Sequence, residues 1–179
     1  MLDWNVVVSI REDCYKLAHK LLQAFGRVDH TDYYNVFALK VEDVQVFLDA
    51  LRQTAERDPA LAHCLARVIP ATRCFAFQSA EEFEAHAKEA AAGFVPDLLG
   101  KTFYVRMHRR GFHQKLASQR EEQLLDAFLL EQLARTDAPG KIRFADPDAV
   151  IAVETIGPWA GLSLWKREDR ARYPFVRVN

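Results

Sequence analysis

The sequence has few of the residues that define disulfide-rich or linker-rich proteins. Its 179 residues include only seven glycines and seven prolines, too few for long flexible or proline-rich linkers. The cysteines number three, Cys14, Cys64 and Cys74, and they lie far apart without a C-x-x-C pair. This pattern predicts neither a disulfide framework nor a zinc ribbon, and it favours a reducing compartment.

Long apolar runs and targeting signals are also lacking. No stretch of about 18 apolar residues is present to span a bilayer. The N-terminal Met-Leu-Asp-Trp-Asn has neither a basic region nor a long apolar region, so we expect no signal peptide. We therefore expect a soluble, cytoplasmic protein without a membrane partner.

What is present is the composition of a folded protein with uneven charge. Half of the residues are apolar and 27% are charged, which is enough to build a core. The net charge is −1, but residues 1–100 carry 10 Lys/Arg against 15 Asp/Glu, whereas residues 101–179 carry 14 against 10. An acidic half joined to a basic half indicates that one surface meets an anionic partner.

The first part of the chain alternates strand and helix patterns. β-Branched residues favour a strand at Trp4–Ile10, and apolar residues at i, i+3 and i+4 predict a helix over Glu12–Phe25 that ends at Gly26. Further along, the patterns predict a short strand near Arg27–Asp29, a strand at Tyr33–Val41, a helix at Glu42–Arg57, an irregular or briefly extended stretch at Arg67–Pro70 and a strand at Arg73–Gln78. This is the order of a split βαβ, ferredoxin-like domain.

The second part predicts a separate α/β unit. Ser79 stands three residues before Glu82, and Ser118 three before Glu121, so each pair predicts a capping box that opens a helix. Pro96 predicts a short turn or helix. The expected strands are Thr102–His108, Lys141–Phe144, Ala149–Ile156 and Leu162–Lys166. The third of these is almost wholly apolar, which suits a strand buried on both faces.

The most distinctive stretch is Lys101–Arg120, which holds six Lys/Arg and two His but no Asp or Glu. It runs from a strand through a basic loop into a helix N-terminus, where N–H groups and the helix dipole favour phosphate. A charge run can also be an ordinary solvated surface, and the stretch alone leaves both interpretations open. Glu121 and Glu122 in the first helical turn would repel a phosphate at the helix end, so the loop side chains are the better candidates.

Each candidate catalytic or metal-binding motif lacks a spacing, a ligand or a context that its chemistry requires. Gly93 and Gly100 are too far apart for a phosphate-binding P-loop, and the segment opens a strand instead of a helix. His108 and His113 lack the further ligands that zinc needs. The Asp-Pro-Asp at 146–148 is explained as a turn. The sequence therefore predicts no enzyme, no metal and no cofactor.

Aromatic residues in the basic half could stack on unpaired bases. Most alternate along strands and are expected in the core. Phe112, Trp159 and Tyr173 fall in expected turns, so they are the candidates for stacking.

The basic half resembles a known family. Phe103-Tyr-Val-Arg-Met-His-Arg-Arg-Gly111, the helix from Ser118, Lys141-Ile-Arg-Phe-Ala-Asp-Pro-Asp148, Val150–Ile156 and Leu162-Ser-Leu-Trp-Lys-Arg167 together resemble a THUMP domain, over about Ser79 to Phe175. Arg67-Val-Ile-Pro70 and Thr72-Arg-Cys74 resemble the segment that joins a ferredoxin-like domain to THUMP in stand-alone proteins assisting tRNA cytidine acetylation. The resemblance implies an α/β (α+β) protein with a ferredoxin-like domain at 1–78 and a THUMP domain at 79–179.

The resemblance also implies a function. We expect a non-catalytic protein that binds the acceptor stem and 3′ end of tRNA and presents it to a separate tRNA-modifying enzyme, such as a cytidine acetyltransferase. The expected RNA-binding residues are Arg106, Arg109, Arg110, His113, Lys115 and Arg120, with Lys166 and Arg167 as a second rank. Two alternatives stay open: a protein–protein scaffold whose acidic first half docks a partner enzyme without any RNA role, and an enzyme with a small-molecule site. The sequence does not reveal the oligomeric state.

Overall fold

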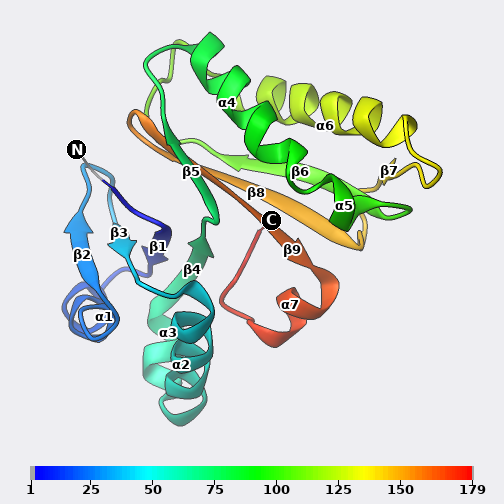
Figure 1. Cartoon of the computed structure of the whole chain (residues 1–179). Coiled ribbons are helices and arrows are strands. Elements are labelled where there is room, and N and C mark those ends of the chain that lie inside the picture. The colour runs from blue at the N-terminus through cyan, green and yellow to red at the C-terminus, as the bar shows by residue number, and fades with distance from the viewer. Residues whose placement is uncertain (1–2, 179) are drawn as a thin grey trace. The chain divides into compact units, whose positions relative to one another are not determined.

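The computed structural model describes residues 3–178, which form two compact units, each with its own sheet and helices (Figure 1). The first unit comprises the described residues up to Pro70 together with Ala171–Arg177. The second comprises Ala71–Arg170 and Val178.

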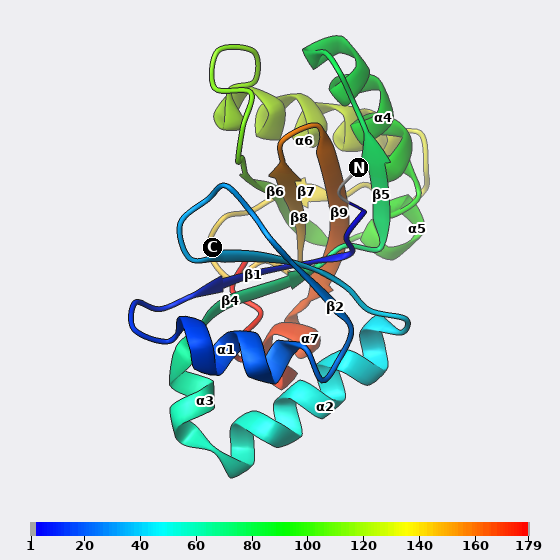
Figure 2. The same ribbon diagram turned by 90° about the vertical axis from the view of Figure 1, so that its left-hand side faces the viewer.

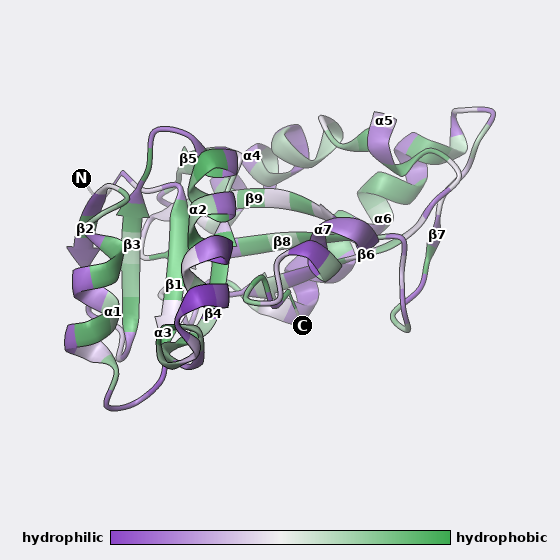
Figure 3. Ribbon diagram, turned by 90° about the horizontal axis from the view of Figure 1, so that it is seen from below, coloured by the Kyte–Doolittle hydropathy of each residue, from purple (hydrophilic) through white to green (hydrophobic). Residues whose placement is uncertain are grey.

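The first unit is an antiparallel sheet with helices packed on it (Figure 2). Its elements are β1 (Val6–Ile10), α1 (Tyr15–Leu22), β2 (Arg27–His30), β3 (Val36–Lys40), α2 (Val44–Arg57), α3 (Pro59–Cys64) and β4 (Leu65–Pro70). The strand order is β2-β3-β1-β4, and every neighbouring pair is antiparallel. This is the split βαβ arrangement of a ferredoxin-like domain, so the expected fold of this part is confirmed. Figure 3 shows β1 and β3, the two central strands, coloured as largely hydrophobic.

Local details differ from the sequence-based expectation. The first helix begins at Tyr15 because Asp13 has a positive φ of 65°, and it ends at Leu22 instead of Phe25. Gly26 is therefore not a helix cap. A side chain at Gly26 would overlap the carbonyl oxygen of Lys40, so glycine is needed for close approach of two chain segments.

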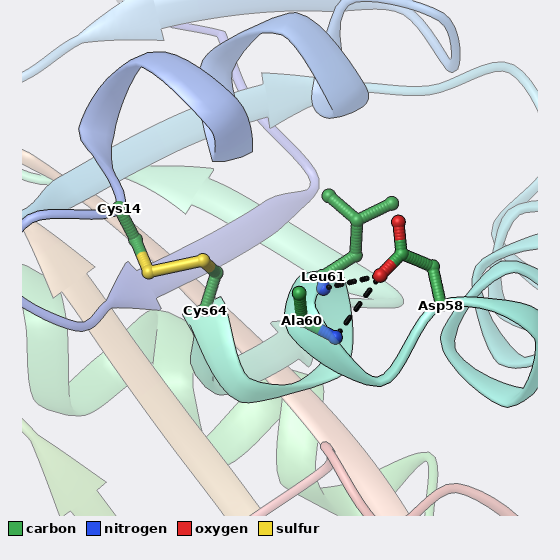
Figure 4. The surroundings of a disulfide bond; sticks show 5 residues. All are labelled: Cys14, Asp58, Ala60, Leu61 and Cys64. Atoms are coloured by element: carbon green, nitrogen blue, oxygen red, sulfur yellow. Dashed lines mark hydrogen bonds between the residues drawn. A yellow bond between two sulfur atoms is a disulfide. The ribbon is translucent and has the colours of Figure 1, made fainter.

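The strand that completes this sheet is β4, in a stretch expected to be irregular or only briefly extended. The short helix α3 precedes it and was not predicted. Asp58 caps α3 by accepting hydrogen bonds from the N–H groups of Ala60 and Leu61, at 3.0 and 3.2 Å, and Pro59 occupies the first turn (Figure 4). The Asp-Pro pair thus ends one helix and starts the next.

Cys14 and Cys64 form a disulfide between the start of α1 and the end of α3 (Figure 4). The cysteine pattern argues against a disulfide framework, and these two residues nevertheless pair. They are 50 residues apart in sequence, yet the fold brings their Cα atoms to 5.3 Å. An odd cysteine count could not reveal this pairing, because it depends on how the two helices pack.

The second unit is a five-stranded mixed sheet. Its elements are β5 (Arg73–Ala76), α4 (Ala80–Ala92), α5 (Val95–Leu98), β6 (Thr102–His108), α6 (Ser118–Ala134), β7 (Lys141–Ile142), β8 (Ala149–Ile156), β9 (Trp159–Lys166) and most of α7 (Arg167–Arg172). The strand order is β5-β9-β8-β6-β7, with β6 parallel to both β7 and β8. Helices α4 and α6 cover one face (Figure 1). The expected α/β fold of this part is confirmed.

The core of the second unit lies between that sheet and those helices. Leu125, Leu129 and Leu133 of α6 are at most 1% exposed and pack in one cluster with Val105 and Ile151. β8 is buried along its whole length, as its continuous apolar sequence predicts.

The boundary between the units differs from the expected division after residue 78. β5 pairs with β9, so the second unit starts at Ala71. The C-terminal segment belongs to the first unit, where the N–H of Val68 donates to the carbonyl of Phe175 at 2.9 Å. Both assignments depend on contacts between residues about 90 to 110 positions apart, which local patterns do not encode.

The two predicted capping boxes have opposite outcomes. Ser79 caps α4, because its hydroxyl accepts from the N–H of Glu82 at 3.2 Å and the Glu82 carboxylate accepts from Gln78 N–H at 2.7 Å. Ser118 does not cap α6. The helix already includes Ser118, and the residue before it, Ala117, makes no side-chain cap.

Candidate nucleic-acid interface

The outer edge of β6 is closed by carboxylates and not by a strand. β7 pairs only with Thr102 and Phe103, which leaves the rest of this edge without a strand partner. The Asp126 carboxylate accepts from Val105 N–H at 2.9 Å, and Glu122 accepts from Met107 N–H at 2.8 Å. Acceptors four residues apart on α6 thus match alternate N–H groups of the strand, and they protect an edge that could otherwise pair with another chain.

This arrangement changes the acidity of Asp126. Burial raises the pKa of its carboxyl to about 7, while the N–H of Val105 lowers it. The nearby Glu122 charge raises it further, and Arg106 lowers it. The charge at this position therefore changes near neutral pH.

A groove of 570 Å³ follows the same edge, between β6, the first turns of α6 and Phe144. Arg106 projects into it, with its guanidinium 5.4 Å from the centre of the Tyr104 ring and 3.7 Å from the Glu122 carboxylate. Phe144 is 67% exposed, and its ring centre is 5.3 Å from that of Tyr104. An exposed aromatic ring beside a guanidinium can hold a planar anionic ligand, such as a nucleotide.

Two arginines of the basic loop after β6 make contacts that hold the loop against the rest of the unit. Arg110 lies 2.6 Å from the carboxylate of Glu154, with 14% of the arginine side chain and none of the glutamate exposed. The main chain of Arg110 also accepts from Gly157 N–H at 2.9 Å. Arg109 donates to the carbonyl of Gly111 at 2.8 Å. Arg110 therefore anchors the loop to β8, and its guanidinium is not displayed to solvent as the RNA-binding hypothesis requires.

The rest of the loop is more open. His113 and Lys115 are exposed, and the Lys115 ammonium lies 5.8 Å from the centre of the Phe112 ring. Arg120 is 70% exposed and 3.2 Å from Glu84 of α4. These side chains remain accessible to an anion at the end of the sheet where β6 finishes.

The second-rank candidates, Lys166 and Arg167, lie at the opposite end of the sheet. Lys166 pairs across β8 with Ala149, which pairs with Phe103. Five residues of strand, at about 3.3 Å each, put this end about 17 Å from His108. Both cations are in ion pairs. These are Lys166 with Asp97 at 2.8 Å, and Arg167 with Asp146 at 3.0 Å and Asp148 at 3.3 Å.

Three exposed cations at that same end were not singled out from the sequence. They are Lys101, Lys141 and Arg143, and none forms an ion pair with a described residue. The groove beside β6 leads from Phe144, next to Arg143, to His108 and the first turn of α6. The signal that could have found this end is Lys-Ile-Arg-Phe at 141–144, a predicted strand in which cations alternate with apolar residues.

The aromatic rings considered for base stacking differ in their exposure. Tyr173 is 2% exposed in the first unit and donates to Asp49 at 2.7 Å, so this candidate ring has no exposed face for a base. Phe112 has a positive φ of 53° and packs against Phe77 with ring centres 4.7 Å apart, which uses one side of its ring in the core. Trp159 opens β9 and is partly buried. Phe144 is the exposed ring beside the groove.

No family model and no curated protein matches this sequence. Solved structures do resemble it. PH1313 from Pyrococcus horikoshii has a TM-score of 0.61 at 12% identity, covering 90% of this chain and 54% of that one. TrmN from Thermus thermophilus has a TM-score of 0.62 at 15% identity, covering 89% and 44%. A 4-thiouridine synthetase in complex with RNA and ATP has a TM-score of 0.55 at 15% identity, covering 92% and 42%.

The present chain thus spans about half the length of these proteins, or slightly less. Within residues 3–178, no helix is both long and apolar enough to span a membrane. At such low identities the likeness concerns the fold alone. It extends over about nine-tenths of this chain and supports a ferredoxin-like unit followed by an α/β unit of the THUMP-like type.

Proposed function

We propose that this protein binds tRNA, at the acceptor stem and 3′ end, and presents it to a separate tRNA-modifying enzyme without performing chemistry itself. A cytidine acetyltransferase is the enzyme that the sequence resemblance suggests. The proposal includes the cytoplasm as the place of action.

The observation that carries the proposal is the groove along β6. It places Arg106 and an exposed aromatic ring, Phe144, between two groups of cations about 17 Å apart. Lys101, Lys141 and Arg143 lie at one end, and Lys115 and Arg120 at the other, with His113 in the same loop as Lys115. A single strand of a few nucleotides has the length, the phosphates and the stackable bases to follow this path.

The adaptor role is supported by what the carboxylates do. Glu122 and Asp126 are the acidic groups of the groove, and both hold main-chain N–H groups of β6. That task is structural. The likeness to a 4-thiouridine synthetase solved with RNA, and to TrmN, agrees with an RNA-related role.

The test is binding of a tRNA transcript and of an acceptor-stem minihelix, with and without its single-stranded 3′ end, by fluorescence anisotropy at fixed salt. Arg106→Gln combined with Phe144→Ala should weaken binding of the RNA with a 3′ tail by at least about tenfold, because one stacking ring and one guanidinium are lost. The same change should have little effect on the blunt minihelix. Arg57→Gln, an exposed arginine of α2, is the control. Equal binding by the double variant and the wild type would remove the groove from the proposal.

The scaffold alternative is favoured by a specific observation, since Arg110, Lys166 and Arg167 are already paired with carboxylates. It predicts that partner binding is insensitive to salt and that no RNA co-purifies. A pull-down from the native cell extract, with identification of both bound RNA and bound protein, separates the two functions.

A further inference from the structure

A second concave site lies entirely within the first unit. It has a volume of 480 Å³ and is bordered by α2, α3, the start of β4 and the returning C-terminal segment. Its lining combines apolar residues, among them Ala62, Leu65 and Phe175, with three arginines, Arg52, Arg172 and Arg177. The two last arginines are brought here only because the C-terminal segment packs beside β4.

The apolar wall is preformed. The buried Leu65 and Phe175, 1% and 6% exposed, lie beneath it, and the partly or fully exposed Ala62, Ala171 and Pro174 provide accessible apolar surface. A cavity lined in this way gains free energy when an apolar side chain enters it and displaces water.

The positive charge at this site exceeds the local negative charge. Glu56 is the only acidic residue of the wall, and its carboxylate forms an ion pair with Arg52 Nε at 3.8 Å, a distance too long for a hydrogen bond. That Nε is buried without a hydrogen-bond partner among the described residues. Arg172 is paired with Asp49 at 2.9 Å, whereas the exposed side chain of Arg177 forms no ion pair with a described residue. An incoming carboxylate would meet two guanidinium groups here, that of Arg52, whose side chain is 34% exposed, and that of the exposed Arg177.

We propose that this pocket binds an acidic peptide segment of another protein, with one apolar side chain against Ala62 and Pro174 and carboxylates on Arg52 and Arg177. This inference rests on the proposed function in one respect: the protein that carries the segment would be the tRNA-modifying enzyme. The scaffold hypothesis supposed that the acidic residues of the first half dock the partner. In the present proposal the first unit binds its partner through a basic pocket instead.

RNA fits this pocket less well. The Phe175 ring is buried and packs against Tyr173, with ring centres 6.0 Å apart, so no aromatic face is available for stacking. The wall contains only Arg, Ala, Glu, Leu, Pro and Phe, and no amide or hydroxyl side chain to read a base edge. A sugar–phosphate chain would use the arginines but leave the apolar wall uncovered.

The experiment is selection of random 12-residue peptides displayed on phage against the immobilised full-length chain, with counter-selection against Arg52→Gln/Arg177→Gln. We expect enriched peptides with two or more Asp/Glu around a Leu, Ile or Phe. A synthetic peptide of the enriched sequence should bind the wild type at least about tenfold more tightly than the double variant. Arg57→Gln, which changes an exposed arginine of α2 outside the pocket wall, should bind like the wild type.

A thermal melt of each variant controls for folding. If the double variant is unfolded, the exposed single change Arg177→Gln replaces it. Enriched peptides without an excess of acidic residues, or equal enrichment on wild type and variant, would overturn the proposal. If the wild type enriches no acidic peptides and Arg52→Gln/Arg177→Gln loses tRNA binding, the pocket would be assigned to RNA instead. A wild type that selects acidic peptides but binds no tRNA would refute the proposed function and leave this pocket assignment standing.

Discussion

The guanidinium of Arg110 lies 2.6 Å from a carboxylate oxygen of Glu154, a residue with no exposed surface. The pair joins the basic loop after β6 to the centre of the second sheet, across 44 residues of sequence. A residue that a charge pattern assigns to RNA binding therefore has a structural role. The proposed RNA contacts therefore depend mainly on cations that have no such buried partner.

Replacing Arg110 should destabilise the protein. Arg110→Ala leaves the buried Glu154 charge without this partner, and breaking a buried pair typically costs about 3–5 kcal/mol. Urea unfolding of Arg110→Ala and of Arg143→Ala measures the difference. Arg143 is exposed, so its removal should change the unfolding free energy by less than about 0.5 kcal/mol. Similar stability of the two variants would show that the Arg110–Glu154 pair is not an anchor.

The salt dependence of RNA binding should distinguish charge from stacking. Arg143→Gln should reduce the slope of log K against log salt by about 0.7, the value for one single-strand phosphate contact. Phe144→Ala should instead lower affinity by about 1–3 kcal/mol at every salt concentration, because stacking involves no counterion release. Titrations at several salt concentrations measure both. A slope unchanged in Arg143→Gln contradicts the assignment of that arginine.

Asp126 should make stability depend on pH. Its pKa is raised from 3.8 to about 7 in the folded state, so between pH 4 and 7 the folded protein binds a proton that the unfolded chain does not. This contribution favours folding at low pH and is lost as pH rises through about 7. Asp126→Asn keeps an oxygen acceptor for Val105 N–H and removes the titration.

Urea midpoints of the wild type and Asp126→Asn between pH 5 and 8 test this expectation. The variant should gain stability relative to the wild type as pH rises from 5 to about 7, and the difference should level off above that. A difference that is constant over this range would contradict it.

The two serine positions provide a matched pair of substitutions. Ser79→Ala removes the hydroxyl that caps α4 and should cost about 1 kcal/mol of unfolding free energy. Ser118→Ala removes no cap and should cost less than about 0.5 kcal/mol. Chemical denaturation of both variants measures the effect. The reverse order would restore Ser118 as the cap of α6.

The disulfide should matter only under oxidising conditions. Closing a loop of about 50 residues stabilises the folded state by up to about 4 kcal/mol, through the lost entropy of the unfolded chain. The oxidised protein should therefore melt at a higher temperature than the same protein in a reductant. Cys14→Ser should melt like the reduced form in both buffers, whereas Cys74→Ser should keep the difference. The absence of any shift on reduction would contradict a stabilising Cys14–Cys64 bond.

Much of the fold could be predicted from local patterns. The strands Thr102–His108 and Ala149–Ile156 begin and end where the sequence predicts, because apolar and β-branched residues recur there between clear breakers. β4 could not be predicted with the same certainty, since within residues 3–178 its one strand partner is β1 and its other edge meets the C-terminal segment through Val68. Ser118 shows the same limit at a helix end, where a capping pattern is present without the cap.

The candidate site was predicted less completely. The basic stretch 101–120 did lead to β6 and the groove beside it, and Arg106 lies in that groove. Phe144 was missed because its exposure depends on a turn and on the ring of Tyr104 below it. The pairing of Lys166 with Asp97 was equally hidden, because the two residues are far apart in the chain.

The sequence by itself determined most of the segments that become strands and helices, and that positive charge gathers in the second half. These properties depend on the identities of near neighbours, which repeat with the period of the local structure. Only the tertiary structure decided which cations face solvent, which cysteines pair, and that the C-terminal arginines return to the first unit. Those outcomes depend on distances between residues tens of positions apart, and such distances are fixed only when the sheets and helices pack.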